Sequence, residues 1–555
     1  MKIGMRLSEK RRNISLECEN KIKEIMMKRK KLLALLLGCT MLCSAFFMGC
    51  GADNADGADN ADNGERTTLR LVYPSALTSI DVLDGDGATM LKEISQVVET
   101  LVNVDSEFQL SPSLAESWER TGDTTWQFKL RKGVTYHDGT TMNADSVKWC
   151  LDRSAKENTG FTGTTGIESV DVIDEYTIQI NTAEPSGEVP EALTNVVAAI
   201  IAPSSVNENG DFVQPVGTGY FQYKDFDVST GEFTAVVYDN YWGGAQDSKI
   251  DTREVTAIAD SSTRSLAVQN GEVDIVTDIP FSDLQKLQSN DDLNVLQFNT
   301  ARTYFYTYNT KKEYLADKSV RQALIYAINE EEVVSDVLLG VGGVPNGMFM
   351  DDVPWNNTDV ELYKYDPKKA SAMLKEAGFE DIDNDGLLEY RGEEVSLNIV
   401  TGSRRPGNPL IAQATQGYFS ELGLDTTVEV LEGTAYSDAI ENGNYDLCLS
   451  SAATGYVPSA SYYLNQYYHS DSNNMKQAGF SDPALDALIE KCRNLESGEE
   501  KYEVSREAQA LAQEDAVVYT VALYGAVFAM DADITGFDYS AAVHDFIVPY
   551  STDFK

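Results

Sequence analysis

The chain has 555 residues, of which 42% are hydrophobic, and a formal net charge of −44 at pH 7. A chain of this length exceeds what one hydrophobic core supports, so two or three lobes are expected. The strongly acidic charge excludes nucleic acid as a partner, because the phosphate backbone would be repelled. Imidazole chemistry has few candidates, since the three histidines are His137, His469 and His544.

Residues 1–49 have the pattern of a secretory signal peptide. Consecutive basic residues precede a long apolar run, and small residues follow where cleavage would fall. The core of the signal is residues 26–49. Residues 1–25 have no signal character, which favours a true start at Met26 or Met27. The alternative, an uncleaved membrane anchor, would need a longer apolar run.

Cys50 ends the sequence Phe-Met-Gly-Cys, which resembles a bacterial lipobox with a small residue before the cysteine. Cys39 fits the same local pattern but leaves a shorter apolar segment, so Cys50 is the favoured lipidation site. Residues 50–66 contain repeats of Ala-Asp-Asn with glycine and predict a flexible acidic tether. Two acyl chains on the cysteine would anchor the protein to the outer face of the cell membrane. Three dispersed cysteines follow residue 50, and we expect them to be packed in the core rather than disulfide-bonded: Cys150, Cys448 and Cys492.

Hydrophobic periodicity predicts an α/β organisation for the first half of the chain. In the strand Trp126–Leu130, alternate residues share one face, and Asn143 would cap the helix that follows. The other strands predicted here are Thr68–Tyr73, two within Val170–Ile180, Phe221–Phe226, Phe233–Tyr238, Glu254–Ile258 and Val273–Val276. The helices predicted here are Met90–Val102, Glu191–Ile201 and Ser261–Asn270.

A second α/β segment is predicted from about Asn299. Asp366 and Pro367 have the residue types of a helix N-cap and first helical position. The helices predicted in this segment are Lys318–Asn329, Glu330–Leu339, Asp366–Gly378, Pro409–Leu422, Tyr436–Asn442, Pro483–Asn494 and Glu499–Glu514. The strands are Tyr304–Tyr308, Val395–Val400, Thr426–Leu431, Tyr445–Ser450, Val517–Ala522 and Val527–Met530.

A series of short motifs runs in order from about Leu69 to the C-terminus. They are Ala115–Trp118, Trp126–Val134, Gly217–Gly219, Asn240–Trp242, Gly271–Asp274, Val320–Leu324 and Tyr365–Ala370. In this order they resemble the extracytoplasmic solute-binding proteins of family 5, which serve ABC importers for dipeptides, oligopeptides and nickel.

The resemblance implies an α/β, periplasmic-binding-protein-like fold with two lobes and an interlobe cleft. The first lobe would comprise residues 67–300 and 516–555, with an extra subdomain inserted at about 105–205, and the second lobe residues 301–515. Ligand would lie in the cleft, the lobes would close over it, and the complex would dock on a membrane permease. The resemblance implies a monomeric receptor with no cofactor and no enzymatic activity.

The resemblance leaves two ligand classes open, a nickel or other metal chelate and an oligopeptide. The peptide-binding branch has an aspartate that takes the peptide amino group, but the corresponding segment here, Thr454–Ser459, has no carboxylate. The nickel-binding branch is similar through Ala516–Met530 and through a histidine shortly after that segment, which corresponds to His469.

Six residues are candidate ligand contacts. Arg404 and Arg405 could clamp a carboxylate with their planar donor forks. Tyr304 and Tyr306 near the lobe crossing could line the pocket. The other candidates are Tyr456, in the matched segment, and His469, although one imidazole alone is a weak metal site. The alternatives are exposed loop arginines, core strand packing for the tyrosines and a surface loop for the histidine.

Asp381–Gly386 resembles the start of an EF-hand loop, but Gly392 stands where a bidentate glutamate is needed. A turn is therefore expected rather than a metal site.

Two further functions stay open, a secreted peptide hydrolase and a surface adhesion protein. The sequence contains no nucleophile motif such as Gly-x-Ser-x-Gly that would favour the hydrolase.

Overall fold

The computed structural model describes residues 66–542 and 547–555. The predicted signal peptide, Cys50 and nearly all of the tether lie outside these residues. All described residues belong to one compact unit. In the described ranges, no helix has both the length and the apolar character needed to cross a membrane.

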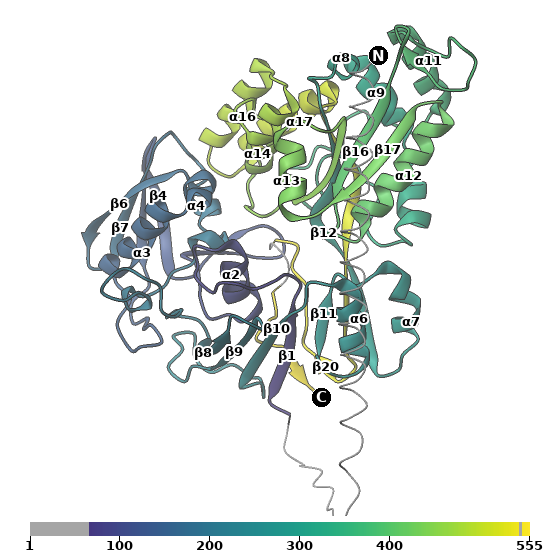
Figure 1. Ribbon diagram of the computed structural model, residues 1–555. Helices are drawn as coiled ribbons and strands as arrows, with labels where there is room; N and C mark the ends of the chain where they lie inside the picture. Colours follow the sequence, from purple (N-terminus) through teal and green to yellow (C-terminus); the bar gives the residue numbers. More distant parts are fainter. Residues whose placement is uncertain (1–65, 543–546) are drawn as a thin grey trace, which may run out of the picture. The chain divides into compact units, whose positions relative to one another are not determined.

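A ten-stranded mixed sheet runs through the molecule (Figure 1). From edge to edge its strands are β17 (Asp425–Leu431), β16 (Ser396–Gly402), β18 (Leu447–Ala453), β12 (Leu293–Tyr308), β19 (Val518–Asp531), β11 (Ile275–Thr277), β1 (Thr68–Tyr73), β10 (Thr252–Ala257), β9 (Glu232–Val237) and β8 (Phe221–Asp227). The register between β12 and β19 shifts between Asn299 and Thr303. After the shift β12 also pairs with β18, whereas the distal half of β19 pairs with β11. The two long strands therefore connect two lobes.

Strand β19 is one continuous strand, so the prediction of separate strands at Val517–Ala522 and Val527–Met530 was wrong. Gly525 lies between the two predicted strands, but it does not break β19. A Cβ atom at Gly525 would lie 2.3 Å from the backbone nitrogen of Gly342. The glycine therefore permits a close backbone approach within a strand.

The inserted subdomain is built on a four-stranded antiparallel sheet in the order β4 (Ala115–Gly122), β5 (Thr125–Leu130), β7 (Thr177–Thr182) and β6 (Ile167–Asp174). The predicted alternation in β5 is confirmed, because Trp126, Phe128 and Leu130 are all buried. Asn143 caps helix α3 (Ala144–Glu157) as predicted, with its side chain accepting a hydrogen bond from the Ser146 amide at 3.0 Å.

Helices cover both faces of the sheet. The main ones are α6 (Ser261–Gln269), α9 (Lys318–Tyr326), α11 (Pro367–Ala377), α12 (Gly407–Glu421), α13 (Gly433–Glu441), α14 (Tyr462–Tyr467), α16 (Pro483–Asn494) and α17 (Glu499–Asp515). The predicted cap at Asp366 is confirmed, since its side chain accepts a hydrogen bond from the Lys369 amide. The predicted helix Glu330–Leu339 is a short turn, α10 (Glu330–Glu332), continued as the π-helix η6 (Val333–Val337). The cysteines Cys150, Cys448 and Cys492 are buried and free, as expected.

The helix predicted over Met90–Val102 was wrong in its second half. Helix α2 (Gly85–Thr89) continues as the π-helix η2 (Met90–Ile94), and Gln96 then adopts a left-handed backbone with φ 55°. The Val97 carbonyl accepts a hydrogen bond from the Gly219 amide at 3.1 Å instead of one within a helix. Tertiary packing of this segment therefore outweighs its helical periodicity.

The helix predicted over Glu191–Ile201 is also wrong. Only the short α5 (Val189–Ala192) and the 3-10 turn η3 (Val196–Ala198) form there. The Asn195 side chain accepts a hydrogen bond from the Val197 amide, which starts a new turn, and the Ile200 amide donates to the Glu99 carbonyl at 2.8 Å. The buried apolar residues of this segment therefore pack in the core from an irregular loop and not from one face of a helix.

Glu99 explains why two of the sequence motifs occur together. Its carboxylate accepts hydrogen bonds from the Thr218 hydroxyl at 2.8 Å, the Tyr241 hydroxyl at 3.0 Å and the Trp242 indole at 2.7 Å. Burial raises the pKa of Glu99 to about 7, and these donors oppose the rise. The motifs at Gly217–Gly219 and Asn240–Trp242 thus have a structural role in the first lobe.

Candidate functional site

A cavity of about 1060 Å³ lies where the two lobes meet. The loop after β16, strand β18, helices α13 and α14, and the N-terminus of α6 supply its walls. Apart from several serines, its polar and aromatic lining residues are Asp260, Arg264, Arg302, Arg404, Arg405, Asn408, Glu432, Tyr436, Tyr456, Tyr462, Gln466 and Tyr467. Cavities of this size and position are typical ligand sites.

Arg405 is held by a buried ion pair. Its guanidinium donates to Asp278 Oδ2 at 2.6 Å, and both side chains are less than a tenth exposed. The Tyr524 hydroxyl donates to the other oxygen of Asp278. Arg302 also approaches Tyr524, with its guanidinium 5.9 Å from the ring centroid, compared with 5.6 Å for Arg405. Two guanidinium groups and one carboxylate thus surround this tyrosine.

Arg404 differs from its neighbour in exposure. Its side chain is 54% exposed, and its guanidinium lies 3.6 Å from Asp86 of the first lobe. Arg264 has a structural role, because it donates to the carbonyl oxygens of Ile258, Ala259, Thr277 and Asp278. Burial lowers the pKa of Arg264.

Tyr456 lines the cavity, together with both predicted arginines. Tyr304 and Tyr306 are not among the lining residues, and both are at most 1% exposed. The ring of Tyr304 packs 5.1 Å from that of Tyr524, and burial raises its pKa well above the ordinary value. The Tyr306 hydroxyl donates to Thr415 of α12 at 2.7 Å. Both tyrosines face the core beneath α12.

His469 is placed outside the cavity, in the turn after α14. Its Nδ1 accepts a hydrogen bond from the Asp471 amide at 3.1 Å, which places the proton of the neutral ring on Nε2. That nitrogen lies 3.6 Å from a carboxylate oxygen of Glu490 and 4.0 Å from one of Asp486. The imidazole therefore faces acidic surface groups.

The structure adds cavity residues that the sequence motifs did not indicate. Arg302 is the clearest case, because a single arginine among the apolar, aromatic and hydroxyl side chains of residues 300–308 could have been noticed, and it is only 8% exposed. Asp278 pairs with Arg405 without lining the cavity itself, and it was missed because its partner is far away in sequence. The others include Asp260, Arg264, Asn408, Glu432, Tyr436, Tyr462, Gln466 and Tyr467.

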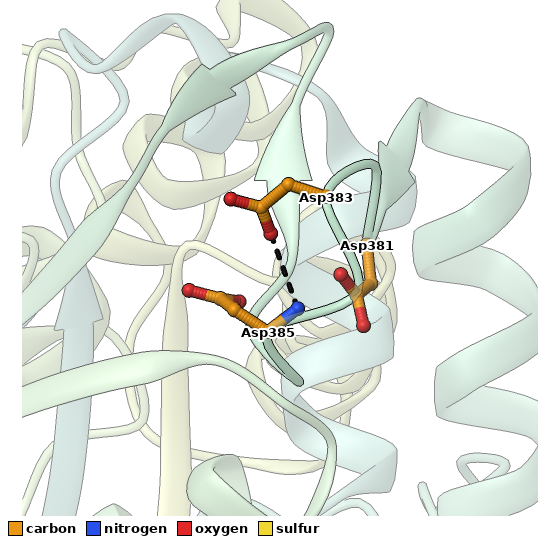
Figure 2. A group of neighbouring side chains, drawn as sticks. All are labelled: Asp381, Asp383 and Asp385. Carbon is orange, nitrogen blue, oxygen red and sulfur yellow. Dashed lines mark hydrogen bonds between the residues drawn. The ribbon is translucent and has the colours of Figure 1, made fainter.

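The acidic loop noted in the sequence brings together Asp381, Asp383 and Asp385 (Figure 2), whose nearest carboxylate oxygens lie within 4.8 Å of one another. These groups accept hydrogen bonds from backbone amides of the same loop. The Asp385 amide donates to Asp383 at 3.1 Å, and the Asn384 and Gly386 amides donate to Asp381. This is the geometry of a tight turn.

Comparison with known proteins agrees with this architecture. The family described as bacterial extracellular solute-binding proteins, family 5 (middle region), matches residues 109–475. The chain belongs to this family. The oligopeptide-binding protein AppA of Bacillus subtilis is 26% identical over 450 residues, which cover 76% of this chain and 80% of that protein.

Solved structures show the same fold. A nickel ABC transporter protein from Bacillus halodurans is 28% identical, with a TM-score of 0.71 over 88% of this chain and 100% of that one. NikA from Brucella suis, solved with Fe(III)-EDTA, is 21% identical, with a TM-score of 0.79 over 88% of this chain and 100% of its own. The predicted two-lobed α/β fold of family 5 is therefore confirmed.

Proposed function

We propose that this protein is the solute receptor of an ABC importer, and that its ligand carries a free carboxylate held by Arg404 and Arg405. The observation that supports this proposal most directly is the group of arginines lining the cavity of a chain with a net charge of −44. A planar guanidinium group matches a carboxylate with two parallel hydrogen bonds.

An oligopeptide is the ligand class that the cavity favours. Its volume of about 1060 Å³ accommodates several amino acid residues. The arginines would receive the terminal carboxylate, and Asp260 or Glu432, which also line the cavity, would receive the amino group. Tyrosine side chains on the walls would contact the peptide side chains. The similarity to AppA agrees with this class.

A metal chelate is the second candidate, favoured by the 28% identity to the nickel ABC transporter protein. Among the described residues that line the cavity there is no histidine or cysteine. A nickel ion would therefore enter with its own chelator, and the carboxylates of that chelator would contact the arginines.

The proposal also includes the boundaries of the two lobes and the attachment of the protein to the membrane. The first lobe would comprise residues 67–300 and 516–555, with the insert at about 105–205, and the second lobe residues 301–515. A monomer anchored through a lipid on Cys50 would hold the ligand outside the cell membrane and deliver it, chemically unchanged, to the permease.

A thermal-shift screen tests the proposal, because a ligand that binds the native state raises the melting temperature. Purified protein is incubated with di- to pentapeptides, or with nickel and free L-histidine. We expect at least one set to raise the melting temperature with saturation and without consumption of the ligand. Steady cleavage of peptides would instead identify a hydrolase, and no shift with either set would favour an adhesion protein.

A further inference from the structure

The inserted subdomain contacts the second lobe through its backbone. The Gly187 amide donates to the Arg493 carbonyl at 2.9 Å, and the Arg120 guanidinium donates to the Asn494 carbonyl at 2.9 Å. A Cβ atom at Gly187 would lie 2.2 Å from the Leu495 carbonyl oxygen. The two segments therefore approach as closely as their backbones allow.

A second contact is apolar and lies at the β2–β3 hairpin (β2, Val102–Val104; β3, Leu110–Pro112). Phe108 in its turn is 4% exposed and has a left-handed backbone with φ 60°, which is rare for a bulky residue. Its ring packs edge-on against Trp355 of the second lobe, with 5.8 Å between centroids. Strain of this kind persists where the surrounding contacts enforce it.

The charged centre of this interface is Glu188. Its carboxylate lies 3.2 Å from the ammonium group of Lys501 on α17, whose side chain is 0% exposed. The hydroxyl groups of Ser459 and Ser461 both donate to the same carboxylate oxygen. A carboxylate from the inserted subdomain thus has three partners in the second lobe.

Two of these partners belong to a segment that forms a wall of the cavity. Residues 455–462 (the wall segment) include Tyr456 and Tyr462, which line the cavity, and the first part of the segment is neither helix nor strand. Its position depends on side-chain contacts. Asn195 donates to the Tyr456 carbonyl at 3.2 Å, and Ser505 donates to the Ala460 carbonyl at 2.7 Å.

We propose that Glu188 is a positioning residue for the binding cavity: it holds the wall segment in place through Ser459 and Ser461 while the inserted subdomain is docked. This inference rests on the proposed capture of ligand in the cavity. Separation of the insert from the second lobe withdraws the carboxylate, so the wall that contains Tyr456 and Tyr462 loosens. Docking of the insert and completion of the binding site are thereby coupled.

Hydrogen exchange of the ligand-free protein, followed by mass spectrometry, tests the proposal. The variant Ser459→Ala/Ser461→Ala removes both hydroxyl donors and leaves the Glu188–Lys501 pair intact. We expect amides of the wall segment to exchange roughly tenfold faster than in the wild type, because local opening becomes easier. The double variant Glu188→Met/Lys501→Met removes the carboxylate acceptor and both charges without leaving one charge buried and unpaired, and should have the same effect.

Glu191→Gln is the matched control. Glu191 accepts a hydrogen bond from Ser497 at 2.7 Å across the same interface, and no hydrogen bond joins it to the wall segment. In the Glu191→Gln variant, the amides of the wall segment should exchange at the wild-type rate. Unchanged exchange in the two double variants, or equal acceleration in the control, would overturn the proposal. The measurement uses no ligand. Its result can therefore be distinguished from a failure of the proposed function, in which no peptide or nickel chelate binds.

Discussion

At the scale of single residues, Arg404 and Arg405 have opposite surroundings although they are adjacent in sequence. Arg405 forms a buried ion pair with Asp278, whereas Arg404 is 54% exposed and 3.6 Å from Asp86. Loss of one partner from a buried pair leaves an uncompensated charge, but an exposed pair contributes little to stability. A change at Arg404 therefore tests ligand binding with little effect on folding, whereas a change at Arg405 affects both.

Replacement of Arg405 by methionine should lower the free energy of unfolding by about 3 kcal/mol, because Asp278 would stay buried without its cation. Arg404→Met is the control and should change it by less than about 0.5 kcal/mol. Urea denaturation of both variants measures the difference. Equal stability of the two variants would contradict the assignment of a buried pair.

Glu99 predicts a pH dependence of stability. Its pKa is about 7 in the folded protein against an ordinary 4.5, so the folded state keeps a proton that the unfolded state loses between these values. The resulting stabilisation is complete below pH 4.5 and is lost as the pH rises through about 7. It amounts to about 3 kcal/mol at most.

Glu99→Gln isolates this effect, because glutamine does not titrate and its carbonyl can still accept the Thr218 and Trp242 hydrogen bonds. We expect the free energy of unfolding of the wild type, relative to that of the variant, to decrease as the pH rises from 4.5 to 7.5. Denaturation curves at both pH values measure it. A constant difference would show that Glu99 does not hold a proton in the folded state.

At the scale of elements, the glycines of the Gly217–Gly219 motif bring two chain segments together. A Cβ atom at Gly219 would lie 2.1 Å from the Gln96 carbonyl oxygen, so alanine cannot fit without a backbone shift. We expect Gly219→Ala to lower the free energy of unfolding by about 1–3 kcal/mol.

The matched control for this change is Gly417→Ala, in the exposed part of α12. A Cβ atom there would meet no other atom within 4 Å, and alanine has the higher helix propensity. It should therefore raise the stability by up to about 1 kcal/mol. If both alanine variants behaved alike in urea denaturation, close backbone approach would not be the reason for the motif.

Local patterns in the sequence were sufficient to predict many elements, including β5 with its buried face and the caps at Asn143 and Asp366. They failed where distant segments decide the structure. The chain leaves the helix at Ile94 because Gly219 bonds to Val97, and β19 continues through Gly525 because another backbone packs there. Such contacts have no signature in local periodicity.

The same limit applies to the site. Arg404 and Arg405 were named for their guanidinium groups and Tyr456 for its position in the matched segment, and all three line the cavity. Tyr304 and Tyr306 lie on the core-facing side of β12 instead. Asp278 could not be found from sequence, since its role depends on a partner more than a hundred residues away.

At the scale of the whole molecule, β12 and β19 connect the lobes, and the cavity lies where the lobes meet. The register shift between Asn299 and Thr303 interrupts the ladder between these strands. Bending at such a point is the expected route for closure over a ligand. The cavity would then open and close as the lobes move, while each lobe keeps its own packing.

Equilibrium dialysis against a mixture of di- to pentapeptides, with nickel and L-histidine in a parallel cell, tests the central claim most directly. The proposed function predicts that a subset of one mixture is retained intact, with one ligand bound per protein. Arg404→Ala should weaken this retention about tenfold, which corresponds to about 1.4 kcal/mol of binding free energy. Retention of nothing, cleavage of the peptides, or equal retention by the variant would contradict capture of a carboxylate ligand in this cavity.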